Sequence, residues 1–221
     1  MKIAIIGCGN IGTKRAISIW PDKNTKMKYF VGPPVKRKNS KCKAQFLAKK
    51  FKGIYSSNWR KVISTDIEAV ILATPPKLFF KIGMEVLKKG KHLLIEKPLG
   101  ENLKQAKSLT KLAKKKKLIL KTGFNLRFDD AVIKAKSLVE KNFIGKKYFI
   151  KCNYVNGSVL TNTNKVGALK DIGCHCINLI QFFVNKKLDI IKSSIQKKEH
   201  SIDDNGFILV NSRNVLGSVH F

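Results

Sequence analysis

The first twelve residues constrain the fold of this chain more than any other segment. An apolar run over residues 3–6 is followed at once by Gly7-Cys8-Gly9-Asn10-Ile11-Gly12, and a helix-like pattern begins at Ile11. In such a strand–turn–helix unit, one glycine makes the tight turn, the next lets the backbone approach a pyrophosphate, and the third lets helix and strand pack closely. The N–H groups at the helix start then face the phosphates. The segment predicts a dinucleotide site whose cofactor-binding residues are Gly7, Gly9, Asn10, Ile11 and Gly12; the alternative is a glycine-rich turn without a ligand.

The first half of the chain alternates strands and helices. The pattern predicts strands over 2–6, 27–31, 67–73, 92–95 and 118–121, and helices over 11–20, 41–51, 78–89 and 103–115. The strands are continuously apolar, which is typical of a parallel sheet covered by helices on both faces. Residues 1–122 are therefore predicted to form an α/β Rossmann domain, a doubly wound parallel sheet.

The second half follows a different pattern. Helices are predicted over 129–141 and 172–183, and strands over 148–156, 190–196, 206–210 and 215–221. Strands without intervening helices predict an α+β domain with a mainly antiparallel, open-faced sheet over residues 123–221. Because the chain stops inside the last strand pattern, we expect this domain to be incomplete.

Composition narrows the class of protein. Of the 221 residues 43% are hydrophobic, which suffices for a buried core, and no apolar run approaches the length of a membrane span. Without a secretory signal pattern, we expect a soluble cytoplasmic protein. The five cysteines include no CxxC pair, and Cys174-His175-Cys176 has no second ligand pair elsewhere, so no metal site is predicted.

The net charge of +31 is extreme, but its chemistry argues against a nucleic-acid site. Only five of the 45 basic residues are arginine, the residue that such sites favour for bidentate contacts, and the forty lysines are spread over every segment. An AT-rich genome explains this bias better than a specific nucleic-acid footprint, and a charge-driven nucleic-acid binder is the less favoured alternative. The charge would still attract anionic ligands.

The stretch about twenty residues after the fingerprint carries no acid. A carboxylate there normally accepts a hydrogen bond from the ribose 2′-hydroxyl of NAD. Residues 32–38 instead end with Lys36, Arg37 and Lys38, which would attract a 2′-phosphate. We therefore predict Lys36 and Arg37 as cofactor-binding residues and favour NADP slightly over NAD; the alternative is an ordinary basic loop.

Four further motifs complete a recognisable set: Ala73-Thr74-Pro75-Pro76, Glu96-Lys97-Pro98, Gly123-Phe124-Asn125-Leu126-Arg127-Phe128 and Asp171-Ile172-Gly173-Cys174-His175. In this order the chain resembles the Gfo/Idh/MocA family, that of glucose–fructose oxidoreductase and inositol 2-dehydrogenase. The resemblance implies a Rossmann domain, a sheet domain that often forms the oligomer interface, and a site between them. Two positions depart from the family pattern: Asn178 stands where an acid is frequent, and Phe79 where a histidine is frequent.

The resemblance and the residue chemistry together predict a site. Lys97, at the carboxyl end of a strand, can place a positive charge beside a substrate oxygen that becomes alkoxide-like. His175 can accept or return the hydroxyl proton, and Asp171, four residues earlier on a predicted helix, can bind a neighbouring hydroxyl or orient the site. Lys97, Asp171 and His175 are the predicted catalytic residues. The alternatives are one more surface lysine, a helix N-cap at Asp171 and a core histidine.

The remaining predicted cofactor contacts come from the strand ends and the domain junction: Thr74, Pro75, Glu96, Lys97, Asn125 and Arg127. The predicted activity is hydride transfer between NAD or NADP and a sugar, cyclitol or related polyol or keto substrate. The alternative is a non-catalytic protein of the same fold that senses NAD(P)H or a sugar. A homo-oligomer formed through the second domain's sheet is expected when the protein is full length, without a membrane or specific nucleic-acid partner.

Overall fold

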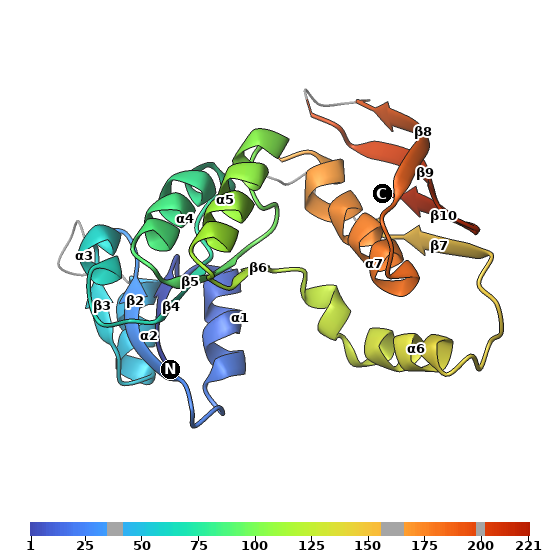
Figure 1. Ribbon diagram of the computed structural model, residues 1–221. Coiled ribbons are helices and arrows are strands. Elements are labelled where there is room, and N and C mark those ends of the chain that lie inside the picture. The colour runs from blue at the N-terminus through green and yellow to red at the C-terminus, as the bar shows by residue number, and fades with distance from the viewer. Residues whose placement is uncertain (35–41, 156–165, 198–201) are drawn as a thin grey trace. The chain divides into compact units, whose positions relative to one another are not determined.

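The computed structural model describes residues 1–34, 42–155, 166–197 and 202–221, and the chain divides into two compact units, Met1–Gly123 and Phe124–Phe221 (Figure 1). The sequence predicts this boundary between residues 122 and 123. No helix among the described residues is long and apolar enough to cross a membrane.

A parallel sheet forms the centre of the first unit. Its six described strands are ordered β3-β2-β1-β4-β5-β6, and every neighbouring pair is parallel. The strands are β1 (Lys2–Ile6), β2 (Lys26–Val31), β3 (Ile54–Ser56), β4 (Ala69–Leu72), β5 (His92–Ile95) and β6 (Leu120–Thr122). The order reverses between β1 and β4, where an open α/β sheet binds its ligand beyond the carboxyl ends of the strands.

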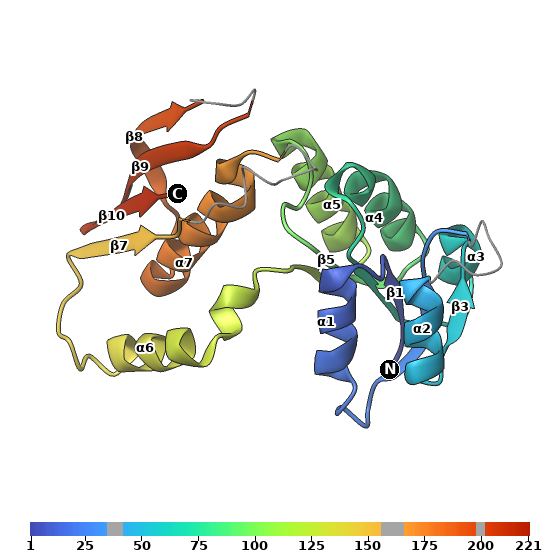
Figure 2. The ribbon, with the colours of Figure 1, turned by 180° about the vertical axis from the view of Figure 1, so that it is seen from behind.

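Helices cover both faces of this sheet, as Figure 1 shows and Figure 2 shows from behind. They are α1 (Asn10–Ile19), α2 (Lys43–Lys50), α3 (Trp59–Ile63), α4 (Phe79–Lys88) and α5 (Leu103–Lys115). Alternate residues of β1 enter two separate cores. Ile5 packs with Ala16 of α1 and Leu47 of α2, whereas Ile6 belongs to the cluster that contains Val86 of α4 and Leu109 of α5. The predicted doubly wound α/β domain is confirmed.

The pair β3–α3 is absent from the sequence-based prediction. β3 has only three residues, too few to show a periodicity, and it joins the sheet through the register of Tyr29 with Ile54. In α3 the side chain of Asn58 accepts a hydrogen bond from the Lys61 amide, so that side chain caps the helix start.

The second unit contains a smaller, mixed sheet. Its four described strands are ordered β7-β10-β9-β8; β10 runs parallel to β7, and the other pairs are antiparallel. The elements are α6 (Asp130–Glu140), β7 (Phe149–Asn153), α7 (Cys174–Val184), β8 (Asp189–Gln196), β9 (Asn205–Ser212) and β10 (Val215–His220). One face packs on α7 through Ile180, Val210 and Val219, whereas Phe149 and Leu216 are exposed. The α+β class and open-faced sheet are as predicted.

The helix that carries His175 begins earlier than predicted. A π-helical turn, Leu169–Gly173, precedes α7. The Leu169 amide donates to Oδ2 of Asp203 at 2.6 Å, and the Ala168 amide donates to the Asp203 carbonyl at 2.8 Å. Asp203, distant in sequence, therefore caps the helical segment, a partnership that local periodicity cannot reveal.

Candidate functional site

The three glycines of the fingerprint have three different environments. Gly7 has a φ of +95°, and a Cβ there would lie 2.5 Å from the carbonyl of Ala73. A Cβ on Gly12 would lie 2.0 Å from the carbonyl oxygen of Gly7, so this glycine permits the close packing of α1 on the β1 turn. A Cβ on Gly9 would meet nothing within 4 Å. Gly7 and Gly12 are therefore required for the close packing of the backbone, whereas Gly9 leaves space beside the backbone at the start of α1.

The start of α1 is suited to an anion. Gly9 occupies the N-cap position and supplies no side-chain cap, and the first turn carries no acid. The first amides of an α-helix have no partner within the helix and favour negative charge. Beside them, Nζ of Lys43 donates to Oδ1 of Asn10 at 2.9 Å, which adds a cation at the same end.

A cleft of about 930 Å³ opens beyond the carboxyl ends of β1, β2 and β4, entirely within the first unit. Gly7, Gly9, Thr74 and Pro75, four of the predicted cofactor residues, line it. The lining residues that the prediction missed include Pro33, Pro34, Cys42, Lys43, Ser57, Trp59, Leu78 and Lys81. Asn10 and Ile11 stand at the start of α1, where Ile11 is exposed and Asn10 is bound by Lys43, and Gly12 is buried.

The cleft is apolar and electropositive. Among its described lining residues, Lys43 and Lys81 are the charged ones, and none is acidic. Burial raises the pKa of the Cys8 thiol to about 12, so this residue is neutral at physiological pH. Trp59 contributes an aromatic side chain to the cleft wall, and Cζ of Arg60 lies over its ring, 4.4 Å from the ring centroid. Lys36 and Arg37, predicted to select NADP, lie outside the described residues.

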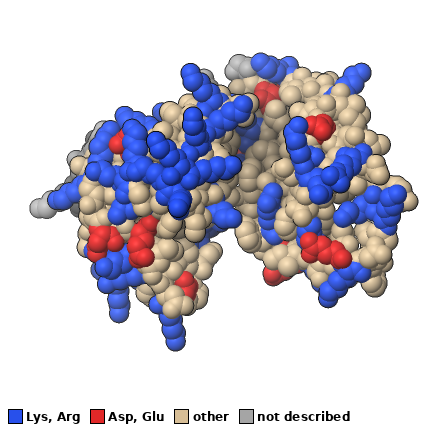
Figure 3. All heavy atoms as spheres, in the orientation of Figure 1, with Lys and Arg blue, Asp and Glu red and all other residues tan. Residues whose placement is uncertain are grey.

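The cleft lysines were hard to recognise because lysine is everywhere. Figure 3 shows Lys and Arg side chains spread over both units and gathered where α4 and α5 lie. Lys43 is the first residue of α2, the helix that follows β2, and Trp59 belongs to the unpredicted β3–α3 segment. These residues are identified as part of the cleft by their position in the fold and not by their residue type.

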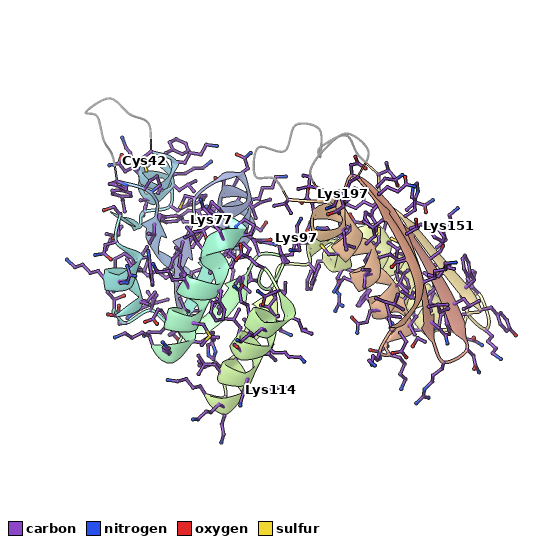
Figure 4. All side chains as sticks on the ribbon, turned by 90° about the horizontal axis from the view of Figure 1, so that it is seen from above. Cys42, Lys77, Lys97, Lys114, Lys151 and Lys197 are labelled. Carbon is purple, nitrogen blue, oxygen red and sulfur yellow. The ribbon has the colours of Figure 1, made fainter. Side chains whose placement is uncertain are left out.

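Glu96 and Lys97 directly follow β5. The Glu96 carboxylate forms an ion pair with Arg15 of α1: Nε donates a hydrogen bond to Oε1 at 2.7 Å, and Nη2 lies 2.7 Å from the same oxygen. Neither residue is among those that line the cleft. In Figure 4 Lys97 lies well apart from Cys42, the cleft residue at the start of α2.

In the second unit, His175 is the second residue of α7 and only 7% exposed. Its ring contacts two aromatic rings edge-on: that of Phe124, with centroids 5.8 Å apart, and that of Tyr154, at 6.2 Å. Asp171 lies four residues earlier, inside the π-helical turn, and is partly exposed. Asp203, rather than Asp171, caps the helical segment, so the N-cap alternative for Asp171 does not apply.

Asn125 and Arg127 lie in a short 3-10 turn, Asn125–Phe128. Arg127 is held inside its own unit: Nε donates to Oδ1 of Asn178 at 2.6 Å, Nη2 donates to the Asn178 carbonyl at 3.4 Å, and the guanidinium lies 5.2 Å from the Phe182 ring centroid. Burial lowers the Arg127 pKa from its usual value, but a guanidinium stays charged at neutral pH. Asn178, where the family often has an acid, is thus the partner that fixes Arg127. Among the described residues, no three His, Cys, Asp or Glu side chains form a group that could hold a metal ion.

Family models match both units. Residues 1–124 match "Oxidoreductase family, NAD-binding Rossmann fold", and residues 132–221 match "GFO/IDH/MocA C-terminal domain". The chain belongs to the Gfo/Idh/MocA oxidoreductase family. The sequence-based recognition of this family is confirmed.

Several curated relatives of this family member are named as dehydrogenases of sugars or cyclitols. Glucose-6-phosphate 3-dehydrogenase of Bacillus subtilis is 29% identical over 209 residues, which cover 89% of this chain and 57% of the relative. Myo-inositol 2-dehydrogenase of Thermotoga maritima is 29% identical over 156 residues, which cover 68% of this chain and 44% of the relative. The chain thus spans little more than half the length of the first and less than half of the second.

Solved structures share the fold over the whole chain. GenD2 from gentamicin A biosynthesis, solved with NAD, has a TM-score of 0.85 and 18% identity, covering 100% of this chain and 65% of its own. KijD10, a 3-ketoreductase from Actinomadura kijaniata solved with NADP, has a TM-score of 0.83 and 20% identity, covering 100% of this chain and 69% of its own. At these identities the likeness shows the fold alone.

Proposed function

We propose that this chain is the cofactor-binding and catalytic part of a dehydrogenase or reductase that acts on a carbinol or keto carbon of a sugar, cyclitol or related polyol. The observation that carries the proposal is the acid-free cleft at the switch point of the sheet, where Gly9 leaves open backbone beside the uncapped start of α1. The dehydrogenase names of the curated relatives support the substrate class.

The residues present fit a nicotinamide dinucleotide. Gly9 and the first amides of α1 would hold the pyrophosphate, and the gap above Gly9 supplies the close approach that this group requires. Pro33, Ser57 and Trp59 line the cleft near the ends of β2 and β3, where an adenosine half would bind, while Thr74 and Pro75 line its other part after β4. When bound, the nicotinamide supplies or accepts the hydride.

The catalytic roles are assigned to one residue of each unit. Lys97 supplies a fixed positive charge to the substrate oxygen as that oxygen becomes alkoxide-like. His175 accepts the hydroxyl proton during oxidation and returns it during reduction. The aromatic contacts of His175 with Phe124 and Tyr154 limit the rotation of its ring, which suits a group that must present one nitrogen to a reacting atom. Asp171 and Asn125 are proposed to bind or orient the substrate and nicotinamide region.

The preference for NADP is part of the proposal. Lys43 and Lys81 are positive groups in a cleft whose described lining carries no carboxylate to bond a ribose 2′-hydroxyl or to repel a 2′-phosphate. These two lysines add to the missing acid and the three cations Lys36, Arg37 and Lys38, on which the sequence-based preference depends.

The test combines cofactor titration with turnover. Quenching of the fluorescence of the two tryptophans, of which Trp59 lines the cleft, or energy transfer to the reduced nicotinamide, would report binding of NADPH and NADH to the purified protein. Steady-state absorbance at the nicotinamide band would then follow oxidation of glucose 6-phosphate, free hexoses and inositols. Binding with turnover of at least one polyol supports the proposal. Tight binding without turnover of any polyol or keto sugar would instead favour a cofactor-sensing protein, and absence of binding would refute both.

A further inference from the structure

Three motifs that are separate in the sequence meet at one point of the first unit. Arg15 belongs to the helix that follows the fingerprint, Glu96 opens the segment after β5, and Gly123 is the last residue of the unit. Both Nε and Nη2 of Arg15 lie 2.7 Å from Oε1 of Glu96, and Nη2 also reaches the Gly123 carbonyl at 3.5 Å. We call these three residues, Arg15, Glu96 and Gly123, the Arg15 brace.

Gly123 makes room for the carboxylate. A Cβ at this position would lie between 2.5 and 2.8 Å from the three carboxyl atoms of Glu96, closer than real Cβ contacts allow. The Gly123 amide also donates to the Ile95 carbonyl at 2.8 Å, which holds the glycine beside the end of β5. A side chain at Gly123 would therefore displace the Glu96 carboxylate from its present position beside Arg15.

Among the described ion pairs, the pair of Arg15 and Glu96 is the one in which neither side chain is highly exposed. The side chains of Arg15 and Glu96 are 25% and 12% exposed, whereas each other described pair has at least one side chain more than 40% exposed. Solvent screening weakens exposed pairs but acts less on this one. Removal of one partner would leave the other charge poorly solvated.

The choice of arginine also indicates a geometric role. Five arginines stand among forty lysines, and the brace is the described ion pair that uses one of them. Arg60 stacks on Trp59 and Arg127 binds Asn178 through two donors, so two further arginines also use the planar, multi-donor guanidinium.

We infer that Arg15 and Glu96 are positioning residues, and that their ion pair fixes the backbone from which Lys97 departs. The Glu96 amide donates to the Leu72 carbonyl at 3.0 Å, so β4 holds the backbone of Glu96 while α1 holds its side chain. Lys97 follows immediately. The brace thus links the helix that would hold the pyrophosphate to the lysine that would act on the substrate. The role of Lys97 in this inference rests on the proposed function, whereas the contacts of the brace do not. In this inference Glu96 positions Lys97, instead of making the cofactor contact that the sequence predicts.

The first measurement does not need activity. Trace acetylation with acetic anhydride, followed by peptide mass spectrometry, compares the labelling rate of Lys97 with those of the other lysines in the same sample. Arg15→Met and Glu96→Gln should each change the relative rate of Lys97 and leave distant lysines, such as Lys114, within the spread of the wild-type protein. Asp66→Asn, which breaks the exposed pairs of Asp66 with Lys2 and Lys28, is the matched control and should leave Lys97 unchanged.

The second measurement separates positioning from cofactor contact. Arg15→Met and Glu96→Gln should each lower single-turnover hydride transfer by about tenfold or more, because small displacements of a catalytic group are costly. The cofactor dissociation constant should hardly change, and the double variant should be no slower than the single ones. Loss of cofactor affinity in Glu96→Gln but not in Arg15→Met would overturn the inference, as would unchanged Lys97 labelling in both. If no substrate turns over, the proposed function fails, and the labelling ratios and cofactor titrations still decide on the brace.

Discussion

Gly9 and His175 stand at the starts of two helices that are constructed in opposite ways. α1 begins abruptly at an open cleft, with no side-chain cap and no side chain at its N-cap position. α7 is preceded by a π-helical turn, and the amide of its first residue, Cys174, already donates to the Leu169 carbonyl. The start of α1 offers backbone to a ligand, whereas the start of α7 offers a side chain.

This difference teaches how each unit can contribute to function. A site made of backbone amides suits a large anion of constant shape, and glycine permits it because the absence of a side chain lets the anion approach the backbone. A site made of one buried imidazole suits proton transfer, and aromatic neighbours such as Phe124 and Tyr154 create it by adding atoms. Substitutions in the two regions should therefore affect different measured quantities.

The largest expected effect is on turnover. His175→Ala and Lys97→Ala should each lower hydride transfer by about 10²–10⁴-fold while cofactor affinity stays nearly constant, because both act on the substrate oxygen. The two losses should not multiply fully in the double variant, since both serve one proton transfer. Single-turnover absorbance and fluorescence titration measure the two quantities separately. Near-wild-type hydride transfer by His175→Ala between pH 6 and 9 would show that the histidine is structural. The contrast between a backbone site at the start of α1 and a side-chain site at the start of α7 would then no longer hold.

A second effect concerns stability and is confined to the first unit. Gly12→Ala places a Cβ 2.0 Å from the Gly7 carbonyl oxygen, so α1 must move away from the β1 turn. We expect a loss of roughly 3 kcal/mol or more in the free energy of unfolding. Denaturant titration followed by circular dichroism measures it. A variant as stable as the wild-type protein would contradict the close packing assigned to Gly12.

The smallest expected effect is on cofactor selection. Lys43→Ala should weaken NADPH binding by about five- to thirtyfold, the value of one charge-assisted hydrogen bond of about 1–2 kcal/mol, and weaken NADH binding less. Lys49→Ala, on the same helix but away from the cleft lining, is the control with the same change of charge. Equal weakening of NADPH and NADH binding would indicate that Lys43 contacts the pyrophosphate, beside its partner Asn10, rather than the 2′-phosphate.

The fold was largely predictable because its signals are local. Apolar runs such as residues 2–6, and a lysine-rich amphipathic helix over 103–115, have the bounds that the pattern predicts. The three-residue β3 gives no period, and it was missed together with α3. The start of the α7 region was also misplaced because its cap, Asp203, comes from a segment distant in sequence.

The candidate site was predictable where glycine or motif order marks it. Gly7, Gly9, Thr74 and Pro75 all line the cleft as a set. Side-chain partners were not predictable: nothing in the sequence indicates that Glu96 is held by Arg15, or that Arg127 is held by Asn178. Such pairings depend on tertiary packing, and among forty lysines the identity of Lys43 as a cleft residue carries no signal of its own.

The measurement that tests the central claim most directly is cofactor binding by Gly9→Val. A Cβ at Gly9 meets no protein atom within 4 Å, so the variant should fold like the wild-type protein, in contrast to Gly12→Ala. The added side chain should nevertheless occupy the space that a pyrophosphate needs and lower affinity for both NADPH and NADH by about 10²-fold, some 2.7 kcal/mol. Ser18→Val, an equally β-branched change elsewhere on α1, should bind normally. The account predicts a folded Gly9→Val protein that does not bind the cofactor; a folded variant that binds as tightly as the wild-type protein would contradict it.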